Sequence, residues 1–236
     1  MRVLVTSDYR ALSLQAAQIV AEAVRLKPDL VLCLPTGNTP LGMYEDLVRR
    51  HRQEGLDFSR VRTFNLDEYI GLGPDHPGSY RAYMRLHFFD HVNVAEQNIH
   101  IPNETESDGY EQAILEAGGL DLLIVGIGAN GHIAFNEPGS SFASRTRAVA
   151  LATETIANAR RHFDNEADVP LTAVTVGIRT ILEARQVLLL ASSADKAGVV
   201  ERAIRGPVSE SLPASALQLH PNVLAILDQA AAVSFR

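Results

Sequence analysis

Short, continuous runs of apolar residues alternate along this chain with segments in which apolar residues recur every three to four positions. The runs are typical of buried strands, and the segments are typical of helices with one apolar face. The predicted strands are residues 29–34, 61–66, 98–102, 121–128, 172–177, 186–191 and 223–227. The predicted helices are residues 40–52, 79–92, 108–119, 154–163 and one from about 195. This order of elements predicts a doubly wound α/β fold, with a mostly parallel sheet and helices on both faces.

No linker-like segment interrupts this alternation, so residues 1–236 are predicted to form a single domain. In doubly wound sheets, ligands bind at the carboxyl ends of the strands. The loops that follow the predicted strands are therefore the places to search for chemistry.

The amino-acid composition and net charge argue against some classes of binding partner. The chain has 236 residues, of which 46% are hydrophobic, and it can bury a sizeable core. Its formal net charge of −7 argues against a nucleic acid or an anionic membrane as partner. The single cysteine, Cys33, can form no internal disulfide, and the chain shows neither a secretion signal nor an apolar run of the ~18 residues that span a membrane. We expect a cytoplasmic protein.

The run "DLLIVGIGANGHIAFNEPGS" carries the pattern G-x-G-x-x-G directly after the most apolar strand, at Gly126, Gly128 and Gly131. In a dinucleotide site the third glycine lies in a long helix, and an acidic residue follows ~20 positions later at a strand end. Here a Pro-Gly pair at 138–139 comes too soon for such a helix, and Glu154 lies at a helix start. We therefore favour a loop whose glycines permit a tight turn or a close approach of backbone to ligand.

His132 follows this loop, and Glu137 comes five residues later. A lone histidine is often structural, and that alternative stays open at this point. A glycine-rich loop after a central strand can aim an imidazole into a cleft, and a nearby carboxylate can set its tautomer, as general acid–base chemistry requires. No second histidine or cysteine is close in sequence, so no metal site is expected.

The acidic pair Asp67 and Glu68 ends the second predicted strand. Successive residues of a strand point to opposite sides, so at most one of the two is expected to face a cleft. The alternative is a solvated loop entry.

Two further strand ends offer anion sites. Thr36, Gly37, Asn38 and Thr39 precede the helix at 40–52, for which Thr39 is the predicted N-cap and Pro40 lies in the first turn. Lys196 lies near the start of the helix that follows residue 191. An ordinary capped turn and a surface lysine are the alternatives. Together these loops indicate acid–base chemistry on a small phosphorylated metabolite.

At this point the chain is seen to resemble glucosamine-6-phosphate deaminases over nearly its whole length. The segments "LPTGNTPLGMY", "TFNLDEYIGL", "HPGSYRAYM", "GIGANGHIAFNEPGSSFASRTR", "TVGIRTIL", "DKAGVV" and "PASALQLH" occur in the order seen in that family. The resemblance implies a doubly wound fold with a mobile helical lid, no organic cofactor and no metal. It also implies conversion of glucosamine 6-phosphate and water to fructose 6-phosphate and ammonia, in the breakdown of amino sugars such as N-acetylglucosamine.

The resemblance also implies roles for individual residues. Asp67 would move a proton between C2 and C1 of the open-chain sugar, His132 would open the ring, and Glu137 would hold and tune His132. The phosphate would be bound by the loop Thr36, Gly37, Asn38 and Thr39, by Lys196, and by an arginine of the lid. In "ANARRHF" that arginine is Arg160, with Arg161 as a neighbour that can be mistaken for it.

Two positions depart from the commoner family pattern. Asn130 stands where many members have aspartate, so it can orient His132 without adding charge. Asn38 stands where glycine is commoner, and asparagine tolerates a left-handed backbone.

Some longer members of this family are hexamers activated by N-acetylglucosamine 6-phosphate. This chain keeps Ser140, Ser141 and Arg147 of that effector site but has Val149 at its lysine position. We expect a monomer or small homo-oligomer without such activation. The competing functions are a 6-phosphogluconolactonase, a sugar-phosphate sensor and, last, a dinucleotide-dependent oxidoreductase.

Overall fold

The structure is a computed structural model that describes residues 1–73, 75–103, 107–160, 163 and 165–235. Within these residues the main sheet has seven strands, and every neighbouring pair is parallel. In spatial order they are β1 (Arg2–Thr6), β10 (Val223–Asp228), β9 (Val187–Ala191), β6 (Leu122–Gly126), β2 (Val31–Leu34), β3 (Arg62–Asn65) and β5 (Ile99–His100).

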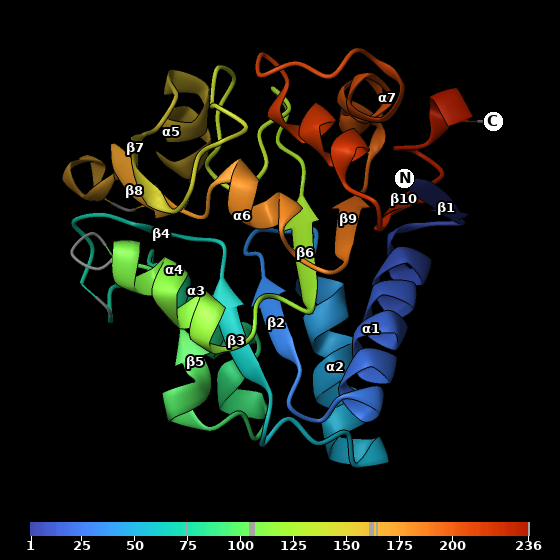
Figure 1. Ribbon diagram of the computed structural model, residues 1–236, viewed down its shortest axis with the longest axis vertical. Coiled ribbons are helices and arrows are strands. Elements are labelled where there is room, and N and C mark those ends of the chain that lie inside the picture. Colours follow the sequence, from blue (N-terminus) through green and yellow to red (C-terminus); the bar gives the residue numbers. More distant parts are fainter. Residues whose placement is uncertain (74, 104–106, 161–162, 164, 236) are drawn as a thin grey trace.

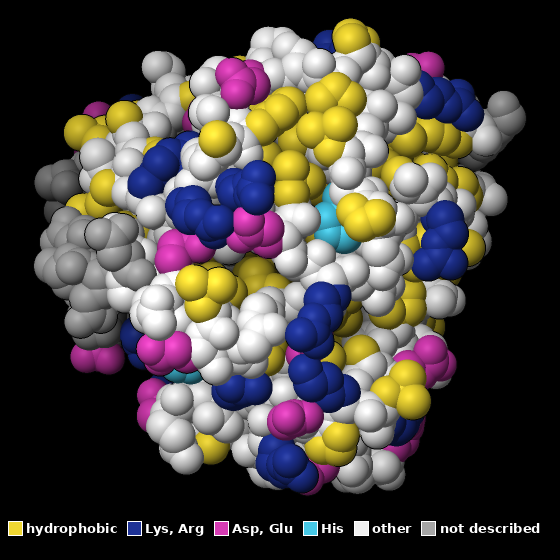
Figure 2. Space-filling view, in the orientation of Figure 1, with side chains coloured by type: hydrophobic (Ala, Val, Ile, Leu, Met, Phe, Trp, Pro, Cys, Tyr) yellow, Lys and Arg dark blue, Asp and Glu magenta, His cyan; other side chains and the backbone are white. Residues whose placement is uncertain are grey.

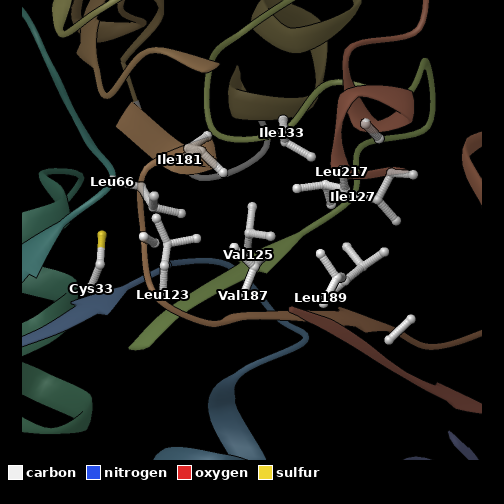
Figure 3. Close-up of a cluster of buried hydrophobic side chains, with 14 of the residues drawn as sticks. Cys33, Leu66, Leu123, Val125, Ile127, Ile133, Ile181, Val187, Leu189 and Leu217 are labelled. Atoms are coloured by element: carbon white, nitrogen blue, oxygen red, sulfur yellow. The ribbon is translucent and has the colours of Figure 1, made fainter. Parts of the chain in front are cut away.

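Helices cover both faces of this sheet because alternate residues of each strand point to opposite sides. In β6, Leu122 and Ile124 pack in one core, and Leu123 and Val125 pack in the other. The first core includes α1 (Tyr9–Leu26), α2 (Leu41–Glu54) and α3 (Tyr80–His87), and the second includes α4 (Ser107–Glu116), α6 (Ile178–Leu182) and α7 (Ala197–Arg205). Figure 3 shows part of the second core, where Leu123, Val125, Val187 and Leu189 lie together. The doubly wound fold predicted from the sequence is confirmed.

A second, antiparallel sheet lies beside the carboxyl ends of the main one. It is built from β4 (Asp67–Tyr69), β8 (Thr172–Thr175) and β7 (Arg147–Ala150). In Figure 1, the helix α5 (Thr153–Ala159) lies on the same side of the molecule as this sheet. The strand expected near residues 172–177 is β8, and it joins this small sheet and not the main one. In Figure 1 the arrowheads of β2, β3, β6 and β9 all point toward the end of the molecule that holds this sheet.

Several element boundaries differ from the prediction. Neither β1 nor α1 was predicted from the sequence. The helix expected at 79–92 ends at His87 and is followed by a separate 3₁₀ turn, η1 (Phe89–His91). The other 3₁₀ turns among the described residues are η2 (Glu96–Asn98), η4 (Glu166–Asp168), η5 (Ala194–Lys196), η6 (Pro213–Leu219) and η7 (Val233–Phe235).

The start of α2 also differs. Pro40 occupies the N-cap position and no side chain caps the helix, so the predicted cap at Thr39 is wrong. The residues before α2 are instead held by tyrosine side chains from outside the loop, as described below.

Charged side chains of both signs lie on the face of the molecule that Figure 2 shows. Figure 2 shows lysines and arginines interspersed with acidic side chains on the face in view, without a broad surface of one sign. Among the described helices, none combines the length and the apolar content that a membrane crossing requires.

Candidate active site

A cleft of about 320 Å³ lies at the carboxyl ends of β2, β3 and β6. Seven of the ten residues predicted for the site line it: Thr36, Gly37, Asn38, Thr39, Asp67, His132 and Lys196. They come from four separate loops that the parallel sheet brings to one edge. The remaining three are Asn130 and Glu137, which lie behind His132, and Arg160, which lies elsewhere.

The glycines of the loop after β6 make room for His132. A Cβ added at Gly128 would come within 2.2 Å of the imidazole Cε1 atom, so the ring lies directly against the glycine backbone. Gly131 has φ +89°, a left-handed conformation that side chains rarely adopt, and its N–H donates to the Gly128 carbonyl. The G-x-G-x-x-G pattern therefore builds a tight turn under an imidazole, as the sequence interpretation favoured.

Glu137 and Asn130 hold the inner side of His132. The Nδ1 atom of His132 is buried and lies 3.5 Å from Oε2 of Glu137, which is longer than a normal hydrogen bond but close enough for a strong electrostatic contact. The Asn130 side chain donates to the same carboxylate oxygen at 2.8 Å and accepts the backbone N–H of His132 at 3.1 Å. The three residues thus form one connected unit.

Glu137 stays ionised in this setting. Burial by itself raises the pKa of the carboxyl group, but contacts with His132, Thr155 and Asn130 outweigh burial and lower the pKa to about 2. Thr155 of α5 donates to Oε1 of Glu137 at 2.5 Å. The sequence reading missed Thr155, since nothing in the pattern of α5 links it to a carboxylate 18 residues earlier.

Asp67 occupies the opposite wall of the cleft, at the start of β4. It is 6% exposed, and within the described ranges no hydrogen bond is donated to its carboxylate. Burial, with the nearby charge of Glu68 as a smaller cause, raises the pKa of Asp67 to about 8. The group therefore changes charge close to neutral pH, which suits a base that must take up and return a proton.

Glu68 points to the other side of the strand, as the alternation predicts. It lines a separate hollow and accepts the backbone N–H groups of Tyr69, Tyr80 and Arg81, the last two at the start of α3. A carboxylate at a helix N-terminus is favoured by the helix dipole. Glu68 thus anchors α3 and leaves the cleft to Asp67.

Strand β8 ties the two walls together. Thr175 pairs with Asp67 across the small sheet, and its hydroxyl accepts the N–H of Phe135, three residues after His132. Asn136, which is fully buried, donates to the carbonyls of Ile133 and Val176. The segment after His132 is therefore fixed to the same strand that positions Asp67.

Lys196 reaches the cleft from a strained turn after β9. Ser193 has φ +85°, and its N–H donates to the buried carboxylate of Asp228 at the end of β10. Ser192 donates to the same carboxylate at 2.5 Å. Asp228 was missed, although an acid at a strand end is the same signal that drew attention to Asp67.

Arg160 lies outside the cleft. Its guanidinium is exposed and pairs with Glu166, and it is not among the residues that line the cleft. The structure therefore does not bring Arg160 to Lys196 and the loop 36–39. Arg161, its possible substitute, lies outside the described residues.

No group of three or more histidine, cysteine or acidic side chains placed to hold a metal ion occurs in the part of the chain that the structure describes. The cleft holds one buried carboxyl group, one imidazole next to a carboxylate, and, at its other end, the loop 36–39 with a lysine.

The chain is similar to known proteins over nearly its whole length. The family described as glucosamine-6-phosphate isomerases/6-phosphogluconolactonase matches residues 7–225. A Thermoanaerobacter pseudethanolicus protein named glucosamine-6-phosphate deaminase is 46% identical, over 98% of this chain and 94% of the relative. A protein of the same name from Alkaliphilus metalliredigens is 48% identical, over 98% of each chain.

Solved structures give the same result. A monomeric glucosamine-6-phosphate deaminase superposes with a TM-score of 0.96 at 45% identity and full coverage of both chains. The 6-phosphogluconolactonase of Trypanosoma cruzi superposes with a TM-score of 0.79 at 19% identity, over 98% of this chain and 96% of that one. The second likeness shows a shared fold. The match over residues 7–225, together with relatives at this identity, shows that the chain belongs to the glucosamine-6-phosphate isomerase/6-phosphogluconolactonase family.

Proposed function

We propose that this protein converts glucosamine 6-phosphate and water to fructose 6-phosphate and ammonia. The observation that carries the proposal is the cleft itself, in which Asp67 and His132 face one space whose other end is the loop 36–39 with Lys196. The relatives named as glucosamine-6-phosphate deaminases at 46–48% identity support it.

The anion-binding end would hold the phosphate and orient the sugar. A dianion at a helix start beside a lysine is favoured by backbone N–H groups and by charge. Binding at this remote group places C1 and C2 between Asp67 and His132. The loss of translational and rotational entropy that orients the reacting atoms then occurs on binding and does not add to the activation barrier.

His132 is proposed to open the ring. The imidazole takes the proton of the C1 hydroxyl and delivers a proton to the ring oxygen, which leaves an aldehyde at C1. Glu137 remains an anion beside Nδ1 throughout, so it stabilises the imidazolium that forms transiently.

Asp67 is proposed to carry the isomerisation. Its carboxylate removes the proton from C2 while the ammonium group on C2 gives a proton to the aldehyde oxygen, and the product is an enolamine. Asp67 then returns its proton to C1, which leaves an iminium at C2. Water adds to C2, ammonia departs with the electron pair of the C–N bond, and the ketone of fructose 6-phosphate remains. The raised pKa of Asp67 makes it a stronger base than an exposed aspartate.

The phosphate role expected for Arg160 stays a proposal. It requires that the guanidinium exchange Glu166 for the substrate phosphate. A lid that carries this arginine toward the cleft would do so.

We further propose that the protein is a cytoplasmic hydrolase of amino sugar catabolism, downstream of N-acetylglucosamine, that works as a monomer or small homo-oligomer without an added cofactor. The monomeric deaminase at 45% identity supports the oligomeric state. The single cysteine and the mixed charge of the surface are consistent with the compartment and with a small-molecule substrate.

One assay tests the function. Ammonia release from glucosamine 6-phosphate is measured without added cofactor, and hydrolysis of 6-phosphogluconolactone is measured with the same preparation. The proposal requires ammonia release. Lactone hydrolysis without ammonia release would reject it in favour of the lactonase alternative.

A further inference from the structure

Three tyrosine hydroxyls, each from a different helix, bind the backbone of the loop that precedes α2. Tyr44 of α2 donates to the carbonyl of Pro35 at 2.5 Å, and Tyr83 of α3 donates to the carbonyl of Gly37 at 2.6 Å. Tyr9, the first residue of α1, donates to the carbonyl of Asn38 at 3.1 Å. The chain has only six tyrosines, and three of them bind the backbone of this one loop.

These bonds fix the direction of the loop N–H groups. In a planar trans peptide, the C=O of one residue and the N–H of the next point in opposite directions. A carbonyl held by a tyrosine therefore turns the following N–H away from that tyrosine. The N–H groups so directed belong to Thr36, Asn38 and Thr39, all of which line the cleft.

Two of these directed N–H groups, those of Asn38 and Thr39, are available to a ligand, and so is the N–H group of Gly37. In the described part of the chain, the N–H groups of Gly37, Asn38 and Thr39 donate no hydrogen bond to protein. Lys196 lines the same cleft. An anion there would therefore meet backbone donors that protein does not already occupy.

The loop needs such support because Gly37 is free to turn. Gly37 has φ +94°, and nothing lies within 4 Å of the position a Cβ would take. Glycine lacks the Cβ that restricts φ and ψ at other residues, so the peptide that joins Gly37 to Asn38 can rotate more readily than its neighbours. Its rotation would point a carbonyl oxygen, with its partial negative charge, into the cleft. The Tyr83 hydroxyl is the group that holds this carbonyl outward.

Tyr83 and Tyr9 act from outside the cleft. Tyr83 lines a neighbouring hollow with His87 and Phe163 and is absent from the lining of the cleft. The Tyr9 hydroxyl also accepts the N–H of Gly42 at 2.9 Å, so it links α1 to the first turn of α2. Neither hydroxyl lines the cleft in which the substrate would lie.

We propose that Tyr9 and Tyr83 are positioning residues that hold the loop 36–39 in its anion-binding conformation. The proposal rests on the proposed function for the identity of the sugar phosphate, but the anion itself can be tested alone. Removing the Tyr83 hydroxyl lets the Gly37 carbonyl turn inward, and removing the Tyr9 hydroxyl leaves the Asn38 carbonyl with the 3.4 Å bond from the Leu41 N–H. Either change weakens phosphate binding, while Asp67 and His132 keep their places.

The test uses Tyr83→Phe, Tyr9→Phe and the double variant, which keep the rings and remove only the hydroxyls. Tyr110→Phe is the matched control, because Tyr110 donates to the Asn65 carbonyl at 2.6 Å on β3 and does not touch the loop. Inorganic phosphate is titrated by calorimetry into each protein, and KM and kcat are measured with glucosamine 6-phosphate. Melting temperatures report folding.

Each single variant is expected to bind phosphate about three- to ten-fold more weakly, as for the loss of one hydrogen bond that orders a site, and the double variant is expected to bind at least about ten-fold more weakly. KM rises in parallel, kcat stays within about two-fold, and Tyr110→Phe binds phosphate as the wild type does.

Three outcomes overturn the proposal: a folded double variant that binds phosphate normally, a Tyr110→Phe variant that loses binding equally, or a wild type that binds no phosphate. A wild type that binds phosphate through these hydroxyls but releases no ammonia rejects the proposed function and leaves the positioning role standing.

Discussion

The imidazole of His132 lies against the backbone of Gly128, so closely that a methyl group on that glycine would overlap ring atoms Cε1 and Nε2, at 2.2 and 2.3 Å. The ring and the glycine are four residues apart, and the tight turn between them is what brings them into contact. The position of the imidazole is thus set by the lack of a side chain beneath it.

Gly128→Ala is therefore expected to displace His132 and to lower kcat for ammonia release at least about 100-fold, the usual scale for loss of a positioned acid–base group. Gly198→Ala is the matched control, because no atom lies within 4 Å of the position its Cβ would take. Steady-state kinetics and melting temperatures of both variants check this. A Gly128→Ala enzyme with normal turnover would contradict the placement of His132.

Asp67→Asn is expected to reduce kcat severely and to leave the affinity for inorganic phosphate nearly unchanged. An amide cannot accept the C2 proton, whereas the anion-binding loop is built from other residues. Single-turnover kinetics and a phosphate titration separate the two effects. Near-normal turnover would remove Asp67 from the mechanism.

Asp67→Asn is also expected to change how the stability of the folded protein depends on pH. Because the folded pKa of Asp67 is raised from 3.8 to about 8, its contribution to stability is fully present below pH ~4 and is lost as the pH rises through about 8. The amide that replaces the carboxyl group carries no charge at any pH, so the variant gains stability relative to the wild type across this window. We expect a relative gain of at least ~1 kcal/mol, or roughly 2–4 °C in Tm, between pH 5 and pH 9. Thermal melts of both proteins at the two pH values measure it, and parallel curves would argue against a buried, uncharged Asp67.

Lys196→Ala and Arg160→Ala are each expected to raise KM for the sugar phosphate, and glucosamine without phosphate is expected to be a very poor substrate. A charge-assisted contact to phosphate contributes roughly 1.5–3 kcal/mol, or about 10- to 150-fold in KM. The larger effect is expected for Lys196, which already lines the cleft. If Arg161→Ala weakens binding and Arg160→Ala does not, the arginine was assigned one residue too early.

The last prediction concerns activation by N-acetylglucosamine 6-phosphate. Arg147 donates to Asn136 at 3.0 Å and to Ser140 at 3.4 Å, so the retained arginine already shapes the loop around Glu137. With Val149 at the lysine position of the effector site, we expect hyperbolic kinetics that N-acetylglucosamine 6-phosphate leaves unchanged. Sigmoidal rate curves that become hyperbolic on its addition would show retained activation.

The residues that line the cleft could be found from the sequence because each follows an apolar run, and parallel strands end at one edge. Alternation predicted that at most one of Asp67 and Glu68 faces the cleft, and the family resemblance indicated Asp67. The phosphate loop was found, but its support was not, since Tyr9, Tyr44 and Tyr83 lie on three helices whose meeting is a tertiary property.

Other features had no local signal. The edge strand β1 was missed because its apolar run has only three residues, Val3 to Val5, and Val3 and Val5 remain 36% and 42% exposed. The antiparallel pairing of β4 with β8 joins residues more than 100 positions apart. The pair between Arg160 and Glu166 depends on how the segment after α5 folds back.

The bond from Thr155 to Glu137 joins α5 to the acid–base unit. A helix that moves away would take one proton donor from the carboxylate, raise the pKa of Glu137 from about 2, and loosen its hold on the imidazole. Thermodynamic coupling is reciprocal, so a positive charge on His132 also favours the helix position in which Thr155 reaches Glu137. The protonation of His132 during ring opening and the position of α5 are therefore coupled. A change in the position of α5 is expected to change the protonation of His132, and the reverse.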